Sequence, residues 1–214
     1  MSIKKQKILI IGSGGREHAI GWKIAQSEKK KDLFFAPGNA GTLELGTNVA
    51  ISATDIPKLV EFAKKEKIDL TLALPDDPLA LGIVDAFQAQ NMRIWGPTKV
   101  ASELEWSKAY AKDFMKRHKI PTAKYEIFTD FKKAKTYVEK GIVPVVIKAS
   151  GLALGKGVIV AQTKEEAIEA LKKILIEKIF GNAGNEVIIE EYLSGTEISI
   201  HAISDGKNYK IFPA

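Results

Sequence analysis

Short apolar runs alternate with amphipathic stretches along the first hundred residues. Runs typical of buried strands lie at 8–11, 33–36, 49–52, 68–74 and 93–95. Between them, apolar residues recur at helical spacing at 19–25, 56–65 and 79–90. Buried strands that alternate with helices build a parallel sheet that is covered on both faces. The pattern therefore predicts an α/β fold with a Rossmann-like domain over residues 1–100.

The pattern changes beyond residue 100. Helices are predicted at 98–104 and 107–118. The segment Lys119-Ile-Pro-Thr122 ends the second helix, because the residue before a proline disfavours helical backbone. We therefore expect residues 101–122 to form connecting helices that lead to a domain junction.

Residues 123–190 predict a small α+β unit. It combines a strand at 125–128, helices near 131–139 and 164–176, and β-branched runs at 145–147 and 158–160. Further strands are predicted at 187–193, 197–203 and 209–212.

Residues 191–214 are expected to begin another sheet. Ile198, Ile200 and Ala202 alternate with polar residues, which predicts one apolar face without a partner layer. A two-stranded hairpin is marginal in isolation. We therefore expect a fragment of a longer protein, whose unpaired edge drives self-association or pairs with the missing segment.

A glycine-rich loop joins the two β-branched runs. Gly151, Gly155 and Gly157 leave room for backbone N–H groups to approach an anion, while Lys148 and Lys156 supply positive charge. The loop is not a Walker A loop, because Lys156 is followed by Gly157 and not by Ser or Thr. The loop predicts a clamp for nucleotide phosphates, and the alternative is a mobile surface hairpin with solvated lysines.

A second glycine-rich turn, Gly12-Ser-Gly-Gly-Arg16, follows the first predicted strand and begins a helix, whose N-terminus attracts an anion. Glu17 occupies the third glycine position of a dinucleotide fingerprint, and no acidic residue ends the second strand, which disfavours a nicotinamide dehydrogenase. We expect this turn to converge with the loops at 37–41, 75–78 and 96–98 at the carboxyl edge of the sheet. The alternative is that their Gly and Pro residues only make turns.

Composition excludes several classes of protein. The 214 residues include no cysteine, which removes disulfides, thiolate metal sites and thiol nucleophiles. Neither a membrane span nor a secretory signal is predicted, so we expect a cytoplasmic protein. The net charge of +6 comes mostly from lysines interleaved with acidic residues, which is typical of a solvated surface and argues against nucleic-acid binding. None of the three histidines is expected to have a catalytic or metal role.

Six segments in order resemble the ATP-grasp ligases, and among them the glycinamide ribonucleotide synthetase (phosphoribosylamine–glycine ligase) family. They are GSGGREHAI at 12–20, PGNAGT at 37–42, TDI at 54–56, SKAYAKDFM at 107–115, HKIPTA at 118–123 and VIKASGLALGKGVIVA at 146–161. The resemblance covers essentially the whole chain. The chain departs from the usual family pattern at Ser150, where Asp is usual, at Asp76, where Glu is usual, and at Leu74, where Gly is common.

The resemblance implies a Rossmann-like (pre-ATP-grasp) domain, an ATP-grasp lid subdomain at 123–190 and the first strands of the main ATP-grasp sheet at 191–214. It implies that lysines meet the ATP phosphates under a lid formed by the loop 151–157, that residues 190–193 line the adenine slot, and that Glu197 accepts hydrogen bonds from the ribose. Because neighbouring strand residues face opposite sides, we expect only one of Glu190 and Glu191 to face outward and the other to serve the site. The implied ATP-binding residues are Lys108, Lys148, Gly151, Gly155, Lys156, Gly157, Val158, Glu190, Glu191, Leu193 and Glu197.

The resemblance also implies a reaction of de novo purine biosynthesis. Glycine would be joined to 5-phosphoribosylamine through a glycyl phosphate, with ATP and Mg²⁺ or Mn²⁺ as cofactors, giving glycinamide ribonucleotide, ADP and phosphate. The metal ligands would lie in the missing part, so the isolated chain is expected to be inactive. The alternatives are a non-catalytic nucleotide-binding module and another ATP-grasp enzyme, such as a purine-pathway carboxylase. The implied substrate-binding residues are Gly14, Gly15, Arg16, Asn39, Gly41, Pro75 and Asp76.

Overall fold

The computed structural model describes residues 5–153 and 156–213, and the chain divides into two compact units. The first unit runs to Ile120 and also includes Ser150–Leu152. The second unit comprises Pro121–Ala149 and the chain from Ala153 onward. Gly155, which the sequence predicts to bind ATP, lies outside the described residues.

A five-stranded sheet forms the centre of the first unit, with the order β3-β2-β1-β4-β5. All its pairings are parallel, as predicted. The order of the strands reverses between β1 and β4, and ligands of such sheets bind at this point, outside the carboxyl ends of the strands. The strands are β1 (Gln6–Gly12), β2 (Lys31–Pro37), β3 (Thr47–Asn48), β4 (Leu70–Ala73) and β5 (Ile94–Trp95).

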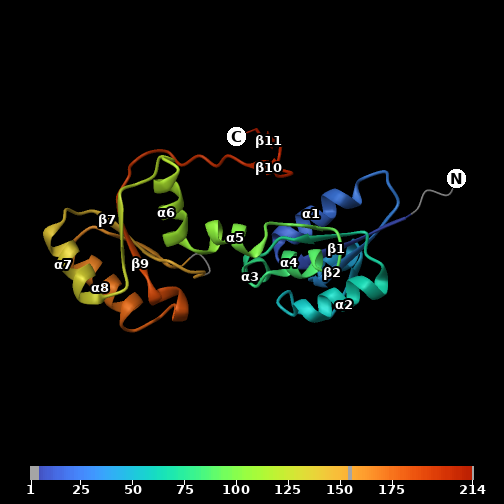
Figure 1. Ribbon diagram of the computed structural model, residues 1–214, viewed down its shortest axis with the longest axis horizontal. Coiled ribbons are helices and arrows are strands. Elements are labelled where there is room, and N and C mark those ends of the chain that lie inside the picture. The colour runs from blue at the N-terminus through green and yellow to red at the C-terminus, as the bar shows by residue number, and fades with distance from the viewer. Residues whose placement is uncertain (1–4, 154–155, 214) are drawn as a thin grey trace. The chain divides into compact units, whose positions relative to one another are not determined.

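Helices cover both faces of this sheet, which confirms the predicted layers (Figure 1). Helix α1 (Gly15–Ala25) packs Ile20 and Ile24 against β1 and β2 on one face. Leu59 and Phe87 belong to the core on the other face. That side carries α2 (Ile56–Glu66), α3 (Asp76–Ala80) and α4 (Ile83–Gln88), and the unit also contains η1 (Gly41–Glu44), α5 (Lys99–Trp106) and α6 (Lys108–Arg117).

Two predicted elements of the first unit were wrong. The helix expected at 79–90 is the pair α3 and α4, because Gly82 adopts φ 90° and the helical backbone cannot continue through that conformation. The strand expected at 49–52 does not form, and the strand at this place in the sheet is β3 at Thr47–Asn48, directly before that range. Val49 still donates its N–H to Phe35 at 2.8 Å, but the Ile51 N–H turns back to the carbonyl of Val49 and the strand ends.

The second unit is built on a four-stranded sheet with the order β6-β9-β7-β8. All its pairings are antiparallel, and β7 with β8 forms the predicted hairpin of β-branched runs. The helices pack on one face through Val138, Leu171 and Ile174 against Ile147 and Ile189. The elements are β6 (Tyr125–Phe128), α7 (Phe131–Lys140), β7 (Val145–Ala149), β8 (Val158–Ala161), α8 (Lys164–Leu175), η2 (Gly181–Asn185) and β9 (Val187–Glu191).

A separate antiparallel hairpin, β10 (Ala202–Ser204) with β11 (Tyr209–Ile211), ends the described chain. The strand expected at 197–203 was wrong in extent, because residues 194–201 have no strand partner and only Ala202–Ser204 pair. Every residue of both strands is exposed. The apolar side chains expected to lack a partner layer are therefore open to solvent within the described residues.

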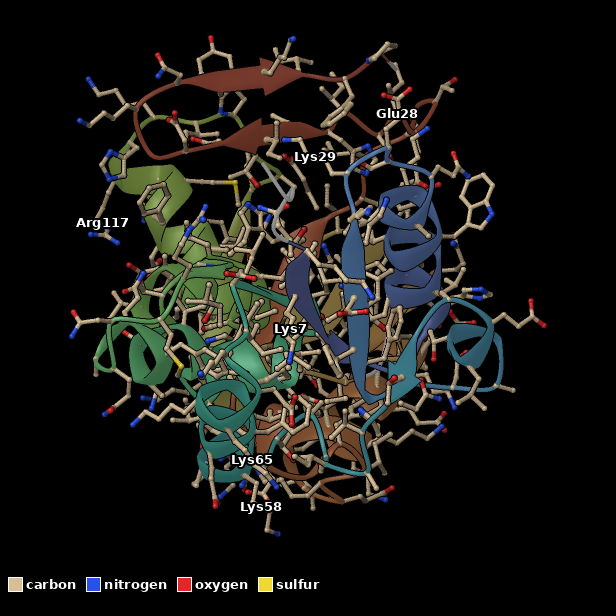
Figure 2. The ribbon with its side chains drawn as sticks, turned by 90° about the vertical axis from the view of Figure 1, so that its right-hand side faces the viewer. Lys7, Glu28, Lys29, Lys58, Lys65 and Arg117 are labelled. Carbon is tan, nitrogen blue, oxygen red and sulfur yellow. The ribbon has the colours of Figure 1, made fainter. Side chains whose placement is uncertain are left out.

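Lysines of the first unit lie mostly on the surface, as the charge pattern predicts. Lys58 and Lys65 project outward from α2 (Figure 2). Lys58 Nζ lies 2.7 Å from Asp55 Oδ2. The hydrogen bond between the two side chains lowers the pKa of Asp55 and raises the pKa of Lys58. Lys31 is different, since its ammonium donates to the carbonyls of Ile24 and Ala25, each at 3.1 Å, at the C-terminal end of α1. That arrangement satisfies carbonyls which a helix end leaves unpaired.

Gly21 provides a test of packing between α1 and the sheet. A Cβ atom at this position would lie 2.6 Å from two ring carbons of Phe35, whose side chain is fully buried. Gly21→Ala is therefore expected to lower the free energy of unfolding by about 1–3 kcal/mol, although alanine favours a helix. Urea denaturation measures it. Gly15→Ala is the control on the same helix, since nothing lies within 4 Å of its Cβ position, and an equal loss there would contradict the steric explanation.

Asp205 provides a test of the hairpin turn. Backbone N–H groups of Asn208 and Lys207 donate to its carboxylate at 2.7 and 2.8 Å, and these bonds hold the pKa of Asp205 below its usual value. A carboxyl whose pKa is lower in the folded state stabilises the fold above its unfolded pKa, and that contribution disappears as the pH falls through the folded pKa. We expect the amide chemical shifts of Lys207 and Asn208 to move together on acidification, and Asp205→Asn to abolish the transition. Unchanged titration in Asp205→Asn would refute the assignment.

Candidate functional site

Three loops of the first unit meet at the carboxyl edge of its sheet. The loop after β2 is tied to the turn after β1, since Gly38 N donates to Gly12 O at 3.0 Å and Asn39 Nδ2 to Ser13 O at 2.8 Å. The loop after β4 is equally close, because a Cβ atom on Gly12 would lie 2.8 Å from the Pro75 ring. The predicted convergence of these loops is therefore observed. These contacts join the turn that carries Gly14, Gly15 and Arg16 to the loops that carry Asn39, Gly41, Pro75 and Asp76.

Charged side chains at the start of α1 are held by the protein itself. Arg16 donates from Nη1 to Leu74 O at 2.9 Å, which connects the turn after β1 to the end of β4. Glu17 is buried, and its Oε2 accepts from Gly14 N at 2.6 Å. A glutamate at the third helical position that reaches back to the N-cap N–H is one half of a capping box. Because this carboxylate already lies at the helix N-terminus, an anion must use other donors of the turn.

A pocket of about 220 Å³ adjoins Asp76 in the same unit. Asp76 and Leu79 of α3 line it on one side, and residues of the β5–α5 loop and of α5 line the rest. The predicted loop at 96–98 thus lies near Asp76, as expected, through Pro97. Trp106 also lines the pocket, and its buried Nε1 has no hydrogen-bond acceptor among the described residues.

One face of the four-stranded sheet in the second unit carries a charged pair. Lys148 pairs with Ile188 and Val158 across the strands, while Val146 pairs with Glu190 and Val160, so all six side chains share this face. Lys148 Nζ lies 2.9 Å from Glu190 Oε2. The Glu190 side chain is 5% exposed and that of Lys148 26% exposed. Val158 and Val160 remain about half exposed beside them.

Glu191 lies on the opposite face, since it follows Glu190 in the strand. Its Oε1 accepts from Lys124 N at 2.8 Å, which fixes the start of β6 to the end of β9. The strand therefore separates the two acidic residues as the alternation predicts, and Glu190 is the one that shares a face with Lys148. Leu193 and Glu197 are exposed in the segment between β9 and β10, and they make no hydrogen bond to this group within the described residues.

The beginning of the glycine-rich loop is anchored on helix α6 of the first unit. Ser150 accepts twice, through its carbonyl from Lys108 N at 2.9 Å and through Oγ from Ala109 N at 3.2 Å. Lys108 Nζ donates to Gly151 O at 3.3 Å. Ser107 Oγ accepts from Tyr110 N, so the first three N–H groups of α6 are satisfied by serines. Ser150 thus satisfies two N–H groups of the first turn of α6, beside the N-cap Ser107.

The end of the loop is packed against the second unit. Gly157 is buried, and a Cβ atom there would lie 2.7 Å from the Ala153 side chain. Its carbonyl accepts from Ala149 N at 2.8 Å. Lys156 is exposed, and its N–H donates to Ala153 O at 2.9 Å. A glycine at 157 is therefore required by the close approach of the two sides of the hairpin.

No group of three or more His, Asp or Glu residues that could hold a metal ion occurs in the described part of the chain. The residues that sequence reasoning missed are polar and mostly buried: Glu17, Thr42, Asn48 and the capping function of Ser150. The spacing of Gly14 and Glu17 is that of a capping box and could have indicated the first. Nothing in the local sequence indicates the contacts of the others.

Two family models together match nearly the whole chain. The phosphoribosylglycinamide synthetase N domain matches residues 6–105, and the ATP-grasp (A) domain of the same synthetase matches residues 106–214. The chain belongs to the phosphoribosylglycinamide synthetase family. The expected family is thereby confirmed, and with it the ATP-grasp fold that the resemblance implied.

Individual relatives agree with this assignment. The phosphoribosylamine–glycine ligase of Pasteurella multocida is 55% identical over 203 residues, which cover 94% of this chain and 47% of the relative. The crystal structure of phosphoribosylamine–glycine ligase from Thermotoga maritima has a TM-score of 0.80 at 36% identity and covers 97% of this chain and 49% of its own. This chain thus spans about half the length of the relatives that it matches.

A more distant structure shows the fold alone. The biotin carboxylase from Campylobacter jejuni, solved as a β-γ-ATP complex, has a TM-score of 0.71 at 19% identity, over 98% of this chain and 50% of its own. The fold of this chain is therefore shared with a protein that differs widely from it in sequence.

The pair Lys148–Glu190 gives a test of electrostatics in the second unit. Lys148→Met removes the ammonium that balances a buried carboxylate, and we expect it to cost about 1–3 kcal/mol of stability, less than for a fully buried pair because Lys148 is partly exposed. Adding Glu190→Gln should recover part of the loss, since no buried charge then remains at that position. Urea denaturation of the single and double variants measures both effects.

The control is Lys173→Met, which breaks the exposed pair of Lys173 with Glu169 on α8. Exposed pairs contribute little, so no measurable change is expected there. A double variant that is less stable than Lys148→Met alone would contradict the electrostatic explanation.

Proposed function

We propose that this chain is the nucleotide-binding and amine-binding portion of a phosphoribosylamine–glycine ligase. In that reaction ATP activates the carboxylate of glycine as a glycyl phosphate, and the amine of 5-phosphoribosylamine displaces the phosphate to give glycinamide ribonucleotide. The family assignment over residues 6–214 is the observation that carries the proposal. The chain spans about half of its relatives, so we assign the complete reaction to the longer protein.

The face of β7, β8 and β9 that carries Lys148 is our proposed site for ATP. Lys148 supplies a compact positive charge for phosphate, and the half-exposed side chains of Val158 and Val160 provide apolar surface for a base. Glu190 is close enough to hold the Lys148 ammonium in place at 2.9 Å. Lys156, Gly157, Leu193 and Glu197 of the same unit complete the proposed set, with Glu197 accepting from the ribose hydroxyls.

The converging loops of the first unit are our proposed site for phosphoribosylamine. They lie where the order of strands reverses, at which α/β sheets bind their ligands. The Arg16 guanidinium and the backbone N–H groups of the glycine turn have the chemistry to hold a sugar phosphate. Asp76 adjoins a pocket in the same unit and has the chemistry to accept from an amine or a hydroxyl.

Catalysis would then depend on positioning and on charge neutralisation, because acyl phosphate formation requires no covalent enzyme intermediate. A divalent cation, Mg²⁺ or Mn²⁺, would neutralise the phosphates in the complete ligase. The described residues contain no carboxylate cluster that fits such an ion. Among the described residues no helix is long and apolar enough to span a bilayer. We propose a cytoplasmic location, and we propose that the exposed hairpin at 202–211 pairs with the rest of the ligase or with a second copy.

The proposal predicts ATP binding without turnover for the purified 214-residue chain. Isothermal titration calorimetry should show ATP binding that Lys148→Ala weakens at least about tenfold, because an ammonium-to-phosphate contact is lost. Lys132→Ala, which removes an exposed lysine from α7, should leave the affinity unchanged. An assay with ATP, glycine and phosphoribosylamine generated from ribose 5-phosphate and ammonia should yield no glycinamide ribonucleotide. Equal ATP affinity in both variants would refute the site.

A further inference from the structure

A closed network of polar groups joins the loop after β2 to the end of β3. The hydroxyl of Thr42 is at its centre, and Thr42 is fully buried. Thr42 Oγ1 accepts from Asn39 N at 2.8 Å. Its single proton is directed at two acceptors, Asn48 Oδ1 at 2.7 Å and Asn39 O at 2.9 Å. Asn39, Thr42 and Asn48 are called the clasp below.

The clasp determines the orientation of the Asn39 side chain. Asn39 Oδ1 accepts from Thr42 N at 3.1 Å, so the amide oxygen must face the clasp and the amide nitrogen must face away. Asn48 Nδ2 donates to Asn39 O at 2.7 Å and holds the backbone of the same residue. The free end of the amide, Asn39 Nδ2, then donates to Ser13 O at 2.8 Å. Both ends of the Asn39 amide are thus occupied by protein groups.

The contact with Ser13 orients the glycine turn. In a planar trans peptide the carbonyl and the following N–H point in opposite directions. Because the Ser13 carbonyl faces Asn39, the Gly14 N–H faces away from it, where Glu17 Oε2 accepts at 2.6 Å. The Gly12 carbonyl accepts from Gly38 N at 3.0 Å, so two successive carbonyls of the turn are held by one loop.

The loop after β2 packs so closely against the clasp and α1 that two of its glycines have no space for a side chain. Gly38 adopts φ +74°, and a Cβ atom there would lie 2.2 Å from Asn48 Oδ1 and 2.8 Å from Thr42 Oγ1. At Gly41 a Cβ atom would lie 2.5 Å from the ring of His18 in α1. Backbone, clasp and helix are therefore in direct contact, and a shift of the clasp must shift the loop.

We propose that the clasp positions the glycine turn 12–15 for a sugar-phosphate ligand, and that Asn39 is a positioning residue and not a direct contact of that ligand. The inference rests on the proposed function for the location of the ligand. It assigns Thr42 and Asn48, which lie behind the loop, a specific part in substrate affinity. The chemistry of the substrate contacts remains with the turn and with Arg16.

The test uses the 214-residue chain with ribose 5-phosphate as the probe. Thr42→Val keeps the shape of the side chain and removes the hydroxyl, and we expect it to weaken probe binding by about tenfold because more than one hydrogen bond is lost. Thr42→Ser restores the hydroxyl and should bind within about twofold of the original chain. Thr71→Val is the matched control, since Thr71 is equally buried but lies within β4.

A second measurement does not depend on the ligand. In NMR spectra of the free chain, Thr42→Val should move the amide resonances of residues 13–15, while Thr42→Ser and Thr71→Val should leave them in place. Asn48→Ala removes the donor to Asn39 O from a partly exposed position, and it should reproduce both effects if Thr42→Val does not fold.

The outcomes separate the two proposals. Probe affinity that is equal in Thr42→Val, Asn48→Ala and the original chain would overturn the clasp, and so would unmoved resonances of the turn. If the original chain does not bind ribose 5-phosphate, the proposed substrate location fails, and the movement of the turn resonances alone then supports or overturns the positioning by the clasp.

Discussion

The parallel pairing of β1 with β2 on one side and β4 on the other is the interaction on which the first unit depends. The two registers bring Gly12 opposite Pro37 and Ile11 opposite Ala73, so the three strands end at the same level. Leu9, Ile10 and Ile11 are completely buried, and apolar packing on both faces of β1 opposes any slip of this register. The three loops meet because the strands that carry them end together.

In the second unit, successive side chains of each strand face opposite sides of the sheet, which separates the apolar core from the charged pair. One face of β7 and β9 supplies Ile147, Val187 and Ile189 to the core with α7 and α8. The other face is then left with Lys148 and Glu190, whose charges compensate each other at 2.9 Å. Removing either partner would leave the other charge, whose side chain is mostly buried, without that partner.

Periodicity predicted most elements, and local chemistry explains the exceptions. The five-stranded sheet, its helices and the β7–β8 hairpin followed from apolar runs whose lengths suit strands or helices. Gly82 was not recognised as a break, because a single glycine in a helical pattern does not reveal its φ. The extent of β10 could not be predicted either, since strand length depends on a partner and Ile198 and Ile200 have none in the described structure. Among the candidate site residues, Lys148 and Gly157 were indicated by the composition of the loop, whereas Thr42 and Asn48 make contacts that only the folded chain creates.

Ser150 has a consequence for how the chain can be divided. Residues 150–152 pack with the first unit, although the chain on either side of them belongs to the second. The first turn of α6 is therefore capped by a residue that a ribosome adds only after β6, α7 and β7 have been made. A polypeptide cut at the junction near Pro121 would contain every strand of the parallel sheet and would keep the N-cap Ser107, but it would lack the two Ser150 acceptors of the first turn of its last helix. The first unit consists of two segments that are separate in the sequence. No single cut of the chain therefore releases all of its residues.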